Sequence, residues 1–242
     1  MEKIVCALWR RDWEDAEAFA IRLLADLPPA LADRGASNVR LNLRDAQVAP
    51  AGGLVQQWQQ PQQDAVVQFW LPSANLHTRA PIDALLAELC GQFAAWLVTE
   101  ATIIANVTKA ARTGDRTDGW SQASFISFRE DMSRNEAIAH WHGHHTRVAI
   151  ETQSNFEYVQ NLIVMPLTEG APAYDAFVEE CFPERAMSDP AAFFDARDDA
   201  QRLDANVAAM MESCNAFIDF ARIDVIPTSQ YDFFAARARV PA

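Results

Sequence analysis

The stretch SRNEAIAHWHGHHTRVAIETQSNFEYVQNLIV, from Ser133 to Val164, contains the clearest helix and strand signals of this chain. Ser133, followed three positions later by Glu136, has the form of a capping box, so we expect a helix over 134–153. The aromatic and β-branched run that follows predicts a strand over 156–167. The stretch therefore predicts one helix followed directly by one strand.

Four of the five histidines lie in this stretch, and they are not equivalent. At helical spacing, His145 shares an apolar face with Ile138, Trp141 and Val148. An imidazole titrates near neutrality, so His145 is the candidate for proton transfer. The alternative is a core histidine that is hydrogen-bonded to a backbone carbonyl.

His140 and His144 lie on the opposite, polar face of the same helix, four residues apart. That spacing occurs in zinc helices, but the sequence HWHGH has no glutamate between the two histidines, unlike HEXXH. We therefore interpret this face as solvated and predict no metal site.

Outward from this stretch, the pattern predicts two halves of similar element order. Strands are expected over 3–9, 39–44, 65–71, 121–128, 156–167 and 222–233, with an extended piece over 103–109. Helices are expected over 13–32, 82–101, 134–153 and 200–217. A further strand is expected early in 171–199 or beyond Met165, and 112–119 is expected to be a linker. The sequence thus predicts an α+β fold with two repeats, 1–111 and 120–242.

Residues 39–44 alternate as a strand does, with Val39, Leu41 and Leu43 on one face and Arg40, Asn42 and Arg44 on the other. If the apolar face lies under helices, both arginines face a cavity. A buried arginine needs an anion, and a substrate carboxylate would supply one in bidentate geometry. Pairing with the protein's own acids is the alternative.

Composition excludes several classes of function. The net charge of −13 argues against a nucleic-acid partner. No apolar run reaches the length of a membrane span, and the N-terminus turns acidic where a signal peptide would stay apolar. The four cysteines lie far apart with no CxxC spacing, which favours buried thiols. We expect a cytoplasmic protein.

The motif residues of this stretch resemble the EthD family. The family pattern has a start like MSREEF, a Trp four residues before a His, and then Tyr-Val-Gln-Asn. Here Met132-Ser133, Trp141, His145 and 158–161 match it. Two positions depart from it: Thr146-Arg147 replace the usual Ala-Pro, and Leu162 replaces the His that often follows Gln-Asn.

The resemblance implies a dimeric α+β barrel, formed here by two ferredoxin-like repeats within one chain, and a homodimer is compatible with it. It further implies a cofactor-independent lyase, a decarboxylase of an aromatic or polyketide-like carboxylic acid. His145 would move the proton, and Arg40 or Arg44 would hold the carboxylate. Tyr158 and Gln160 would stabilise the developing phenolate or enolate oxygen.

Other site residues and other functions remain open. Asn161 would contact substrate only if a bulge turned it to the Tyr158 face, and Trp141 and Trp70 are candidate walls for a planar ligand. The alternatives to a decarboxylase are a cofactor-free monooxygenase or isomerase, and a non-catalytic protein that binds an aromatic ligand. A haem protein is a more distant alternative.

Overall fold

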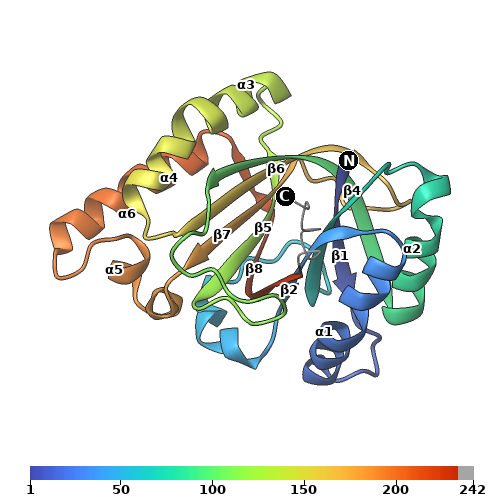
Figure 1. The fold of residues 1–242 in the computed structure, drawn as a ribbon. Helices are drawn as coiled ribbons and strands as arrows, with labels where there is room; N and C mark the ends of the chain where they lie inside the picture. Colours follow the sequence, from blue (N-terminus) through green and yellow to red (C-terminus); the bar gives the residue numbers. More distant parts are fainter. Residues whose placement is uncertain (234–242) are drawn as a thin grey trace, which may run out of the picture.

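Eight antiparallel strands form a closed barrel at the centre of the molecule (Figure 1). The computed structural model describes residues 1–233. The order around the barrel is β1-β3-β2-β8-β5-β7-β6-β4. The strands are β1 (Glu2–Trp9), β2 (Ser37–Leu43), β3 (Ala65–Leu71), β4 (Gln92–Ile104), β5 (Trp120–Phe128), β6 (Glu157–Pro166), β7 (Ala176–Phe182) and β8 (Ile218–Phe233).

Helices cover the barrel on two sides (Figure 1). Those of the first half are α1 (Ala16–Asp33), the 3-10 helix η1 (Ala46–Leu54) and α2 (Leu76–Leu89). Those of the second half are α3 (Arg134–His140), η2 (Trp141–His145), α4 (Thr146–Thr152), the 3-10 helix η3 (Glu184–Met187), α5 (Pro190–Phe193) and α6 (Ala200–Asn215). The mixed α and β composition that the sequence predicts is confirmed. No helix within residues 1–233 is long and apolar enough to cross a membrane.

The predicted long helix over 82–101 is wrong. Helix α2 begins earlier, with Asn75 capping the backbone N–H of Thr78, and it ends at Leu89. The rest of that segment is strand β4, which pairs with β1 and β6. Both faces of its first half are largely buried, so the apolar run QFAAWLV has no polar face from which a strand period could be recognised.

The predicted helix over 134–153 is present but contains a change of pitch. Ser133 and Glu136 form the capping box in both directions, which starts α3. The five residues Trp141–His145 then make a turn of π-helix before α4 continues to Thr152. π-Helical turns inside α-helices occur frequently at functional sites. Here the turn contains Trp141 and His145, both of which are buried.

The two faces of β2 divide as the sequence predicts. Val39, Leu41 and Leu43 pack in the core cluster that contains residues of α1. Arg40 and Asn42 point into the barrel, where they meet inward-facing polar side chains of β3, β5, β7 and β8. The barrel interior therefore holds a connected polar network, and beside it lies an apolar cluster of inward-facing residues that includes Val66, Trp96 and Phe125.

Candidate functional site

A pocket of about 570 Å³ lies outside the barrel, between the second-half strands and the helices that cover them. Its floor is formed by the outer faces of β5, β6, β7 and β8, and its roof by η2 and α6. η1 of the first half and the η3–α5 segment complete the wall. We call this the helix-side pocket. It differs from the expected site, which was the cavity inside the barrel.

One row of the floor is polar. Cross-strand pairing places Glu180 of β7 directly between Tyr158 of β6 and Gln122 of β5. Such neighbours on one sheet face have Cβ atoms about 4.5–5.5 Å apart, so their side chains interact. The next row towards the other end contains Val178 and Ser124, and the sheet face beyond them is apolar. The pocket therefore has one polar end.

Glu180 is the ionisable group of this pocket that is best suited to acid–base chemistry. Its side chain is 7% exposed, and the only hydrogen bond it makes within residues 1–233 is from Asn155 Nδ2 to Oε1, at 2.8 Å. Burial raises the pKa of this carboxyl to about 7, and the Asn155 hydrogen bond opposes that shift only in part. A carboxyl with this pKa can both accept and donate a proton at neutral pH.

His145 lines the same pocket from the roof. Its Nδ1 shares a 3.0 Å hydrogen bond with the Ser213 hydroxyl of α6, and its ring packs 5.0 Å from that of Phe217. Burial, and then the neighbouring His140 and His144, lower the pKa of His145 to about 4. The ring is therefore neutral at neutral pH, and it can exchange hydrogen bonds but is a weaker base than Glu180.

Tyr158 and Trp141 are connected by a hydrogen bond within the site. The Tyr158 hydroxyl accepts hydrogen bonds from Gln160 Nε2 at 2.7 Å and from the Trp141 indole at 3.4 Å. Burial, together with the nearby Glu180 carboxyl, raises the pKa of Tyr158. Gln160 shares the Tyr158 face, as the sequence predicts, but its amide bonds to Tyr158 and Thr146 instead of lining the pocket. Gln160 thus positions Tyr158.

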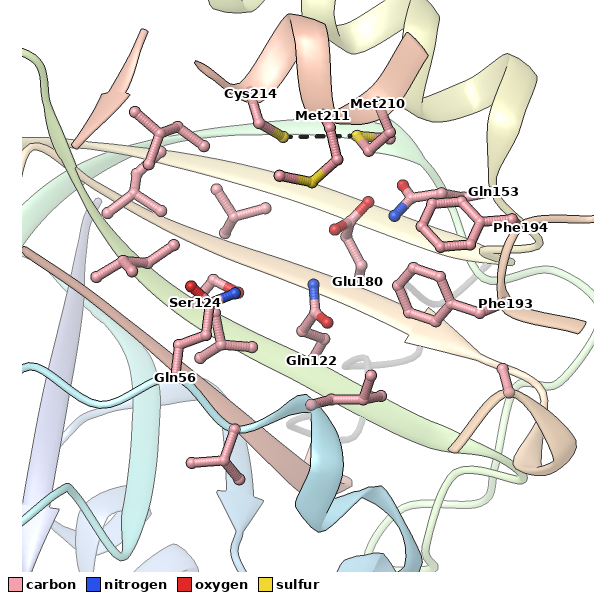
Figure 2. Close-up of a pocket in the computed structure, with 18 of the residues that line it drawn as sticks. Gln56, Gln122, Ser124, Gln153, Glu180, Phe193, Phe194, Met210, Met211 and Cys214 are labelled. Carbon is pink, nitrogen blue, oxygen red and sulfur yellow. Dashed lines mark hydrogen bonds between the residues drawn. The ribbon is translucent and has the colours of Figure 1, made fainter. Parts of the chain in front are cut away.

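The remaining wall of the pocket consists of sulfur-containing and aromatic side chains. Figure 2 shows Met210, Met211 and Cys214 of α6 above the strands, with Phe193 and Phe194 at one side. Thioether and aromatic surfaces adapt to flat apolar ligands. Within residues 1–233, no lysine or arginine lines this pocket.

Arg40 does not reach the helix-side pocket, which corrects its expected role. Its guanidinium lies inside the barrel, 2.7 Å from Asp232, 2.9 Å from Glu179 and 2.8 Å from Glu157. The protein's own acids thus provide the anions, the alternative that the sequence left open. The reason is the alternation of β2: its outward residues pack in the core cluster that contains residues of α1, and Arg40, on the other face, points into the barrel.

Three other predicted residues also lie away from this pocket. Arg44 follows the end of β2, is exposed, and donates to Gln62 Oε1 at 3.3 Å at a separate small surface pocket. Asn161 faces the barrel interior and accepts from Lys3 Nζ at 2.8 Å, because no bulge turns it to the Tyr158 face. Trp70 is half-buried on β3 of the first half.

Glu180 is the residue that sequence reasoning missed. The signal was present in FVEECF, an apolar segment that holds two adjacent acids. In a strand buried on both faces, two successive acids must each be buried on a different face. Such a pair therefore indicates two unusual carboxyl environments. No group of three or more His, Cys, Asp or Glu side chains within residues 1–233 has a geometry suited to a metal ion.

Comparison with known families gives one match in sequence. Residues 129–220, less than half of the chain, match the family model described as the EthD domain. This segment contains His145, Tyr158 and Glu180 but not Gln122. A comparison with curated protein sequences gave no match.

Comparison with solved structures supports the fold. An anthrone oxidase-like protein overlays 100% of this chain and 96% of its own with a TM-score of 0.57 and 10% identity. A protein from Lactobacillus acidophilus NCFM, provisionally described as a monooxygenase, gives a TM-score of 0.48 and 10% identity. The match covers 96% of this chain and 95% of that chain. A chlorite dismutase from Candidatus Nitrospira defluvii gives a TM-score of 0.45 and 12% identity, and the match covers 95% of this chain and 90% of that chain. The first of these likenesses is strong enough to support the dimeric α+β barrel fold.

Proposed function

We propose that this chain, whose residues 129–220 form an EthD domain, is an enzyme that moves a proton to or from a neutral aromatic or polyketide-like molecule. The reaction takes place in the helix-side pocket, and Glu180 is the group that exchanges the proton. The observation that carries the proposal is the Glu180 carboxyl, buried in the floor of an otherwise mostly apolar pocket with a pKa of about 7.

The charge of the pocket favours a neutral ligand. Within residues 1–233 it offers no lysine or arginine to pair with a substrate carboxylate, and an ionised Glu180 would repel one. A neutral carbon acid or phenol needs no cationic partner and is not repelled by the Glu180 carboxylate. When Glu180 takes a proton from such a C–H or O–H bond, the electron pair moves to the ligand's oxygen as an enolate or phenolate.

The resulting enolate or phenolate has two simple fates. It can take a proton back at another carbon, which is an isomerisation, or it can react with dioxygen as co-substrate. Because an anthrone oxidase-like protein shares the fold, a multi-ring ketone is one class of ligand to test. Tyr158 and His145, which line the same pocket, are candidates for hydrogen bonding to the ligand.

Decarboxylation of an aromatic carboxylic acid is the second candidate. A pKa of about 7 leaves a protonated fraction of Glu180 at neutral pH. That proton could be delivered to carbon after carbon dioxide leaves. The EthD resemblance favours this reaction, whereas the absence of an arginine from the described pocket lining disfavours the binding step.

We also propose that the chain is a tandem repeat, with ferredoxin-like units at 1–111 and 120–242, of which 234–242 lie outside the described residues. The barrel order supports this organisation. The first half contributes the order β4-β1-β3-β2, and the second half contributes β8-β5-β7-β6. In each half this is the order fourth, first, third and second strand. In this organisation, the helix-side pocket belongs mainly to the second unit and is closed at one side by η1 of the first.

A turnover screen tests the proposed chemistry. Purified protein is incubated with hydroxyaryl ketones such as anthrone and, in parallel, with aromatic carboxylic acids, and dioxygen uptake, carbon dioxide release and isomer formation are followed. Glu180→Gln is expected to lower kcat/KM by about 10²–10⁴-fold. The matched control is Glu184→Gln, at an exposed position, which is expected to leave the rate unchanged. Full activity in Glu180→Gln would rule the proposal out, and binding without turnover would favour a ligand-binding protein.

A further inference from the structure

The polar end of the helix-side pocket contains two glutamine side chains without an assigned role. Gln122 lies on β5, directly beside Glu180 in the cross-strand register. Gln153 lies at the C-terminal end of α4 and lines the same pocket. Figure 2 shows the Gln122 amide rising from the strand into the pocket and the Gln153 amide directed towards Glu180 from the other side.

Neither amide is used by the protein. Within residues 1–233, the Gln122 side chain makes no hydrogen bond, and neither does that of Gln153. The Gln153 Oε1 atom is moreover buried with no partner. By contrast, the amide of Gln160 on the same sheet face makes two hydrogen bonds, to Tyr158 and Thr146.

A buried polar atom without a partner, such as Gln153 Oε1, costs free energy. Gln122 is half-buried. Gln63 and Gln68 also have a buried Oε1 without a partner, but their amide nitrogens are hydrogen-bonded, whereas the Gln153 amide makes no hydrogen bond within the described residues. A polar atom of this kind that faces a pocket can be satisfied by a bound molecule. The free polar atoms of Gln122, Gln153 and Glu180 all meet at the same end of the pocket.

We propose that Gln122 and Gln153 are the groups that recognise an oxygen atom of the ligand, so that the ligand is a flat, neutral, multi-ring molecule with a carbonyl or hydroxyl oxygen at one end. The oxygen lies between the two amides, next to Glu180. The rings lie over the apolar rows of the floor, beneath Met210 and Phe217. This inference rests on the proposed function, whose ligand class and orientation it specifies.

The amides also have a defined place in the proposed reaction. When Glu180 takes a proton from a carbon or oxygen next to this position, negative charge develops on the ligand's oxygen. An amide N–H already directed at that oxygen stabilises the charge without reorganisation. Gln122 is the better placed of the two donors, because it is fixed on a strand beside Glu180.

The experiment compares two probes that differ by one hydroxyl group, 1-naphthol and naphthalene, and measures their Kd by calorimetry. The unmodified protein is expected to prefer 1-naphthol. Gln122→Leu and Gln153→Leu keep the side-chain volume but remove the amide. Each is expected to lower the preference about three- to tenfold, by weakening 1-naphthol binding while naphthalene binding is kept or improved.

The control variant is Gln47→Leu, at an exposed position outside the pocket, which should leave both affinities unchanged. An unchanged preference in both pocket variants would overturn the inference. So would an equal loss of affinity for both probes, or a failure of the unmodified protein to bind either. Because no turnover is involved, these results are independent of the screen that tests Glu180 as the acid or base.

Discussion

Glu179 and Glu180 are adjacent in sequence, yet their carboxyls are in opposite environments. Glu179 points into the barrel, where burial raises its pKa but Arg40, Gln230, Asn42 and Gln68 lower it more, so that it stays well below the usual range. Glu180 points into the helix-side pocket, where burial dominates and raises its pKa. One strand therefore holds a structural anion on one face and an exchangeable proton on the other.

Replacing Glu180 should change how stability depends on pH. Its pKa is about 7 in the folded chain against 4.5 when exposed, so between these values the folded state binds more protons and wild-type stability falls as pH rises. Glu180→Gln removes this loss. At pH 8 the variant should be more stable than wild type by about 1–3 kcal/mol, and at pH 4 the difference should vanish. Urea denaturation at both pH values measures this, and a constant difference would contradict it.

The titration of His145 should make the protein less stable as the pH falls, the opposite of the effect of Glu180. Its pKa is about 4 in the folded chain and 6.5 when exposed, so the unfolded chain takes up the proton first and stability falls as the pH drops from 6.5 towards 4. His145→Gln keeps a hydrogen-bonding group for Ser213 without this titration. The drop in stability between pH 7.5 and pH 5 should be smaller in the variant by about 1–2 kcal/mol. An equal drop in both proteins would show that His145 already titrates normally.

At the scale of the element, the helix with the π-turn and strand β7 illustrate what local sequence can and cannot predict. The capping box and the spacing of Ile138, Trp141 and His145 predict the helix and its buried face correctly. They do not predict the π-turn over Trp141–His145. Nor does FVEECF show which of its two acids meets a cation, since Arg40 lies 139 positions from Glu179.

Two glycine-to-alanine changes test these elements. Gly143 lies in the π-turn with nothing within 4 Å of an added Cβ, so Gly143→Ala should stabilise the protein by about 0.5–1 kcal/mol. Gly119, before β5, has φ of +114°, and an added Cβ would lie 2.2 Å from the Phe182 carbonyl oxygen. Gly119→Ala should therefore destabilise by about 2 kcal/mol or more. Thermal unfolding distinguishes the two, and equal effects would contradict the local geometry.

At the scale of the whole molecule, Arg40 links the two halves inside the barrel, in addition to the β2–β8 and β4–β6 strand pairings. It lies on β2 of the first half and binds carboxylates on β6, β7 and β8 of the second. The sequence predicted that Val39, Leu41 and Leu43 lie on one face of this strand and Arg40, Asn42 and Arg44 on the other, and that a buried arginine needs an anion. Only the closed barrel shows that the anions come from the same chain, because the paired residues lie more than a hundred positions apart.

Arg40→Met should therefore destabilise the protein without acting on ligand binding directly. Removing the cation leaves three carboxylates uncompensated in or near the barrel interior, which should cost about 3–5 kcal/mol. Arg44→Met, at the exposed end of the same strand, should change stability by less than about 0.5 kcal/mol. Urea denaturation measures both. If Arg40→Met were as stable as Arg44→Met, the ion pairs of Arg40 across the two halves would not contribute to stability.

The central claim is that Glu180 is a carboxyl able to exchange its proton at neutral pH inside a ligand pocket. Infrared difference spectroscopy, wild type minus Glu180→Gln, tests it most directly because a protonated carboxyl has a C=O band that disappears on ionisation. We expect a band that titrates with a midpoint near pH 7 and that shifts when 1-naphthol binds. A band that titrates near 4.5, the value for an exposed glutamate, would contradict it.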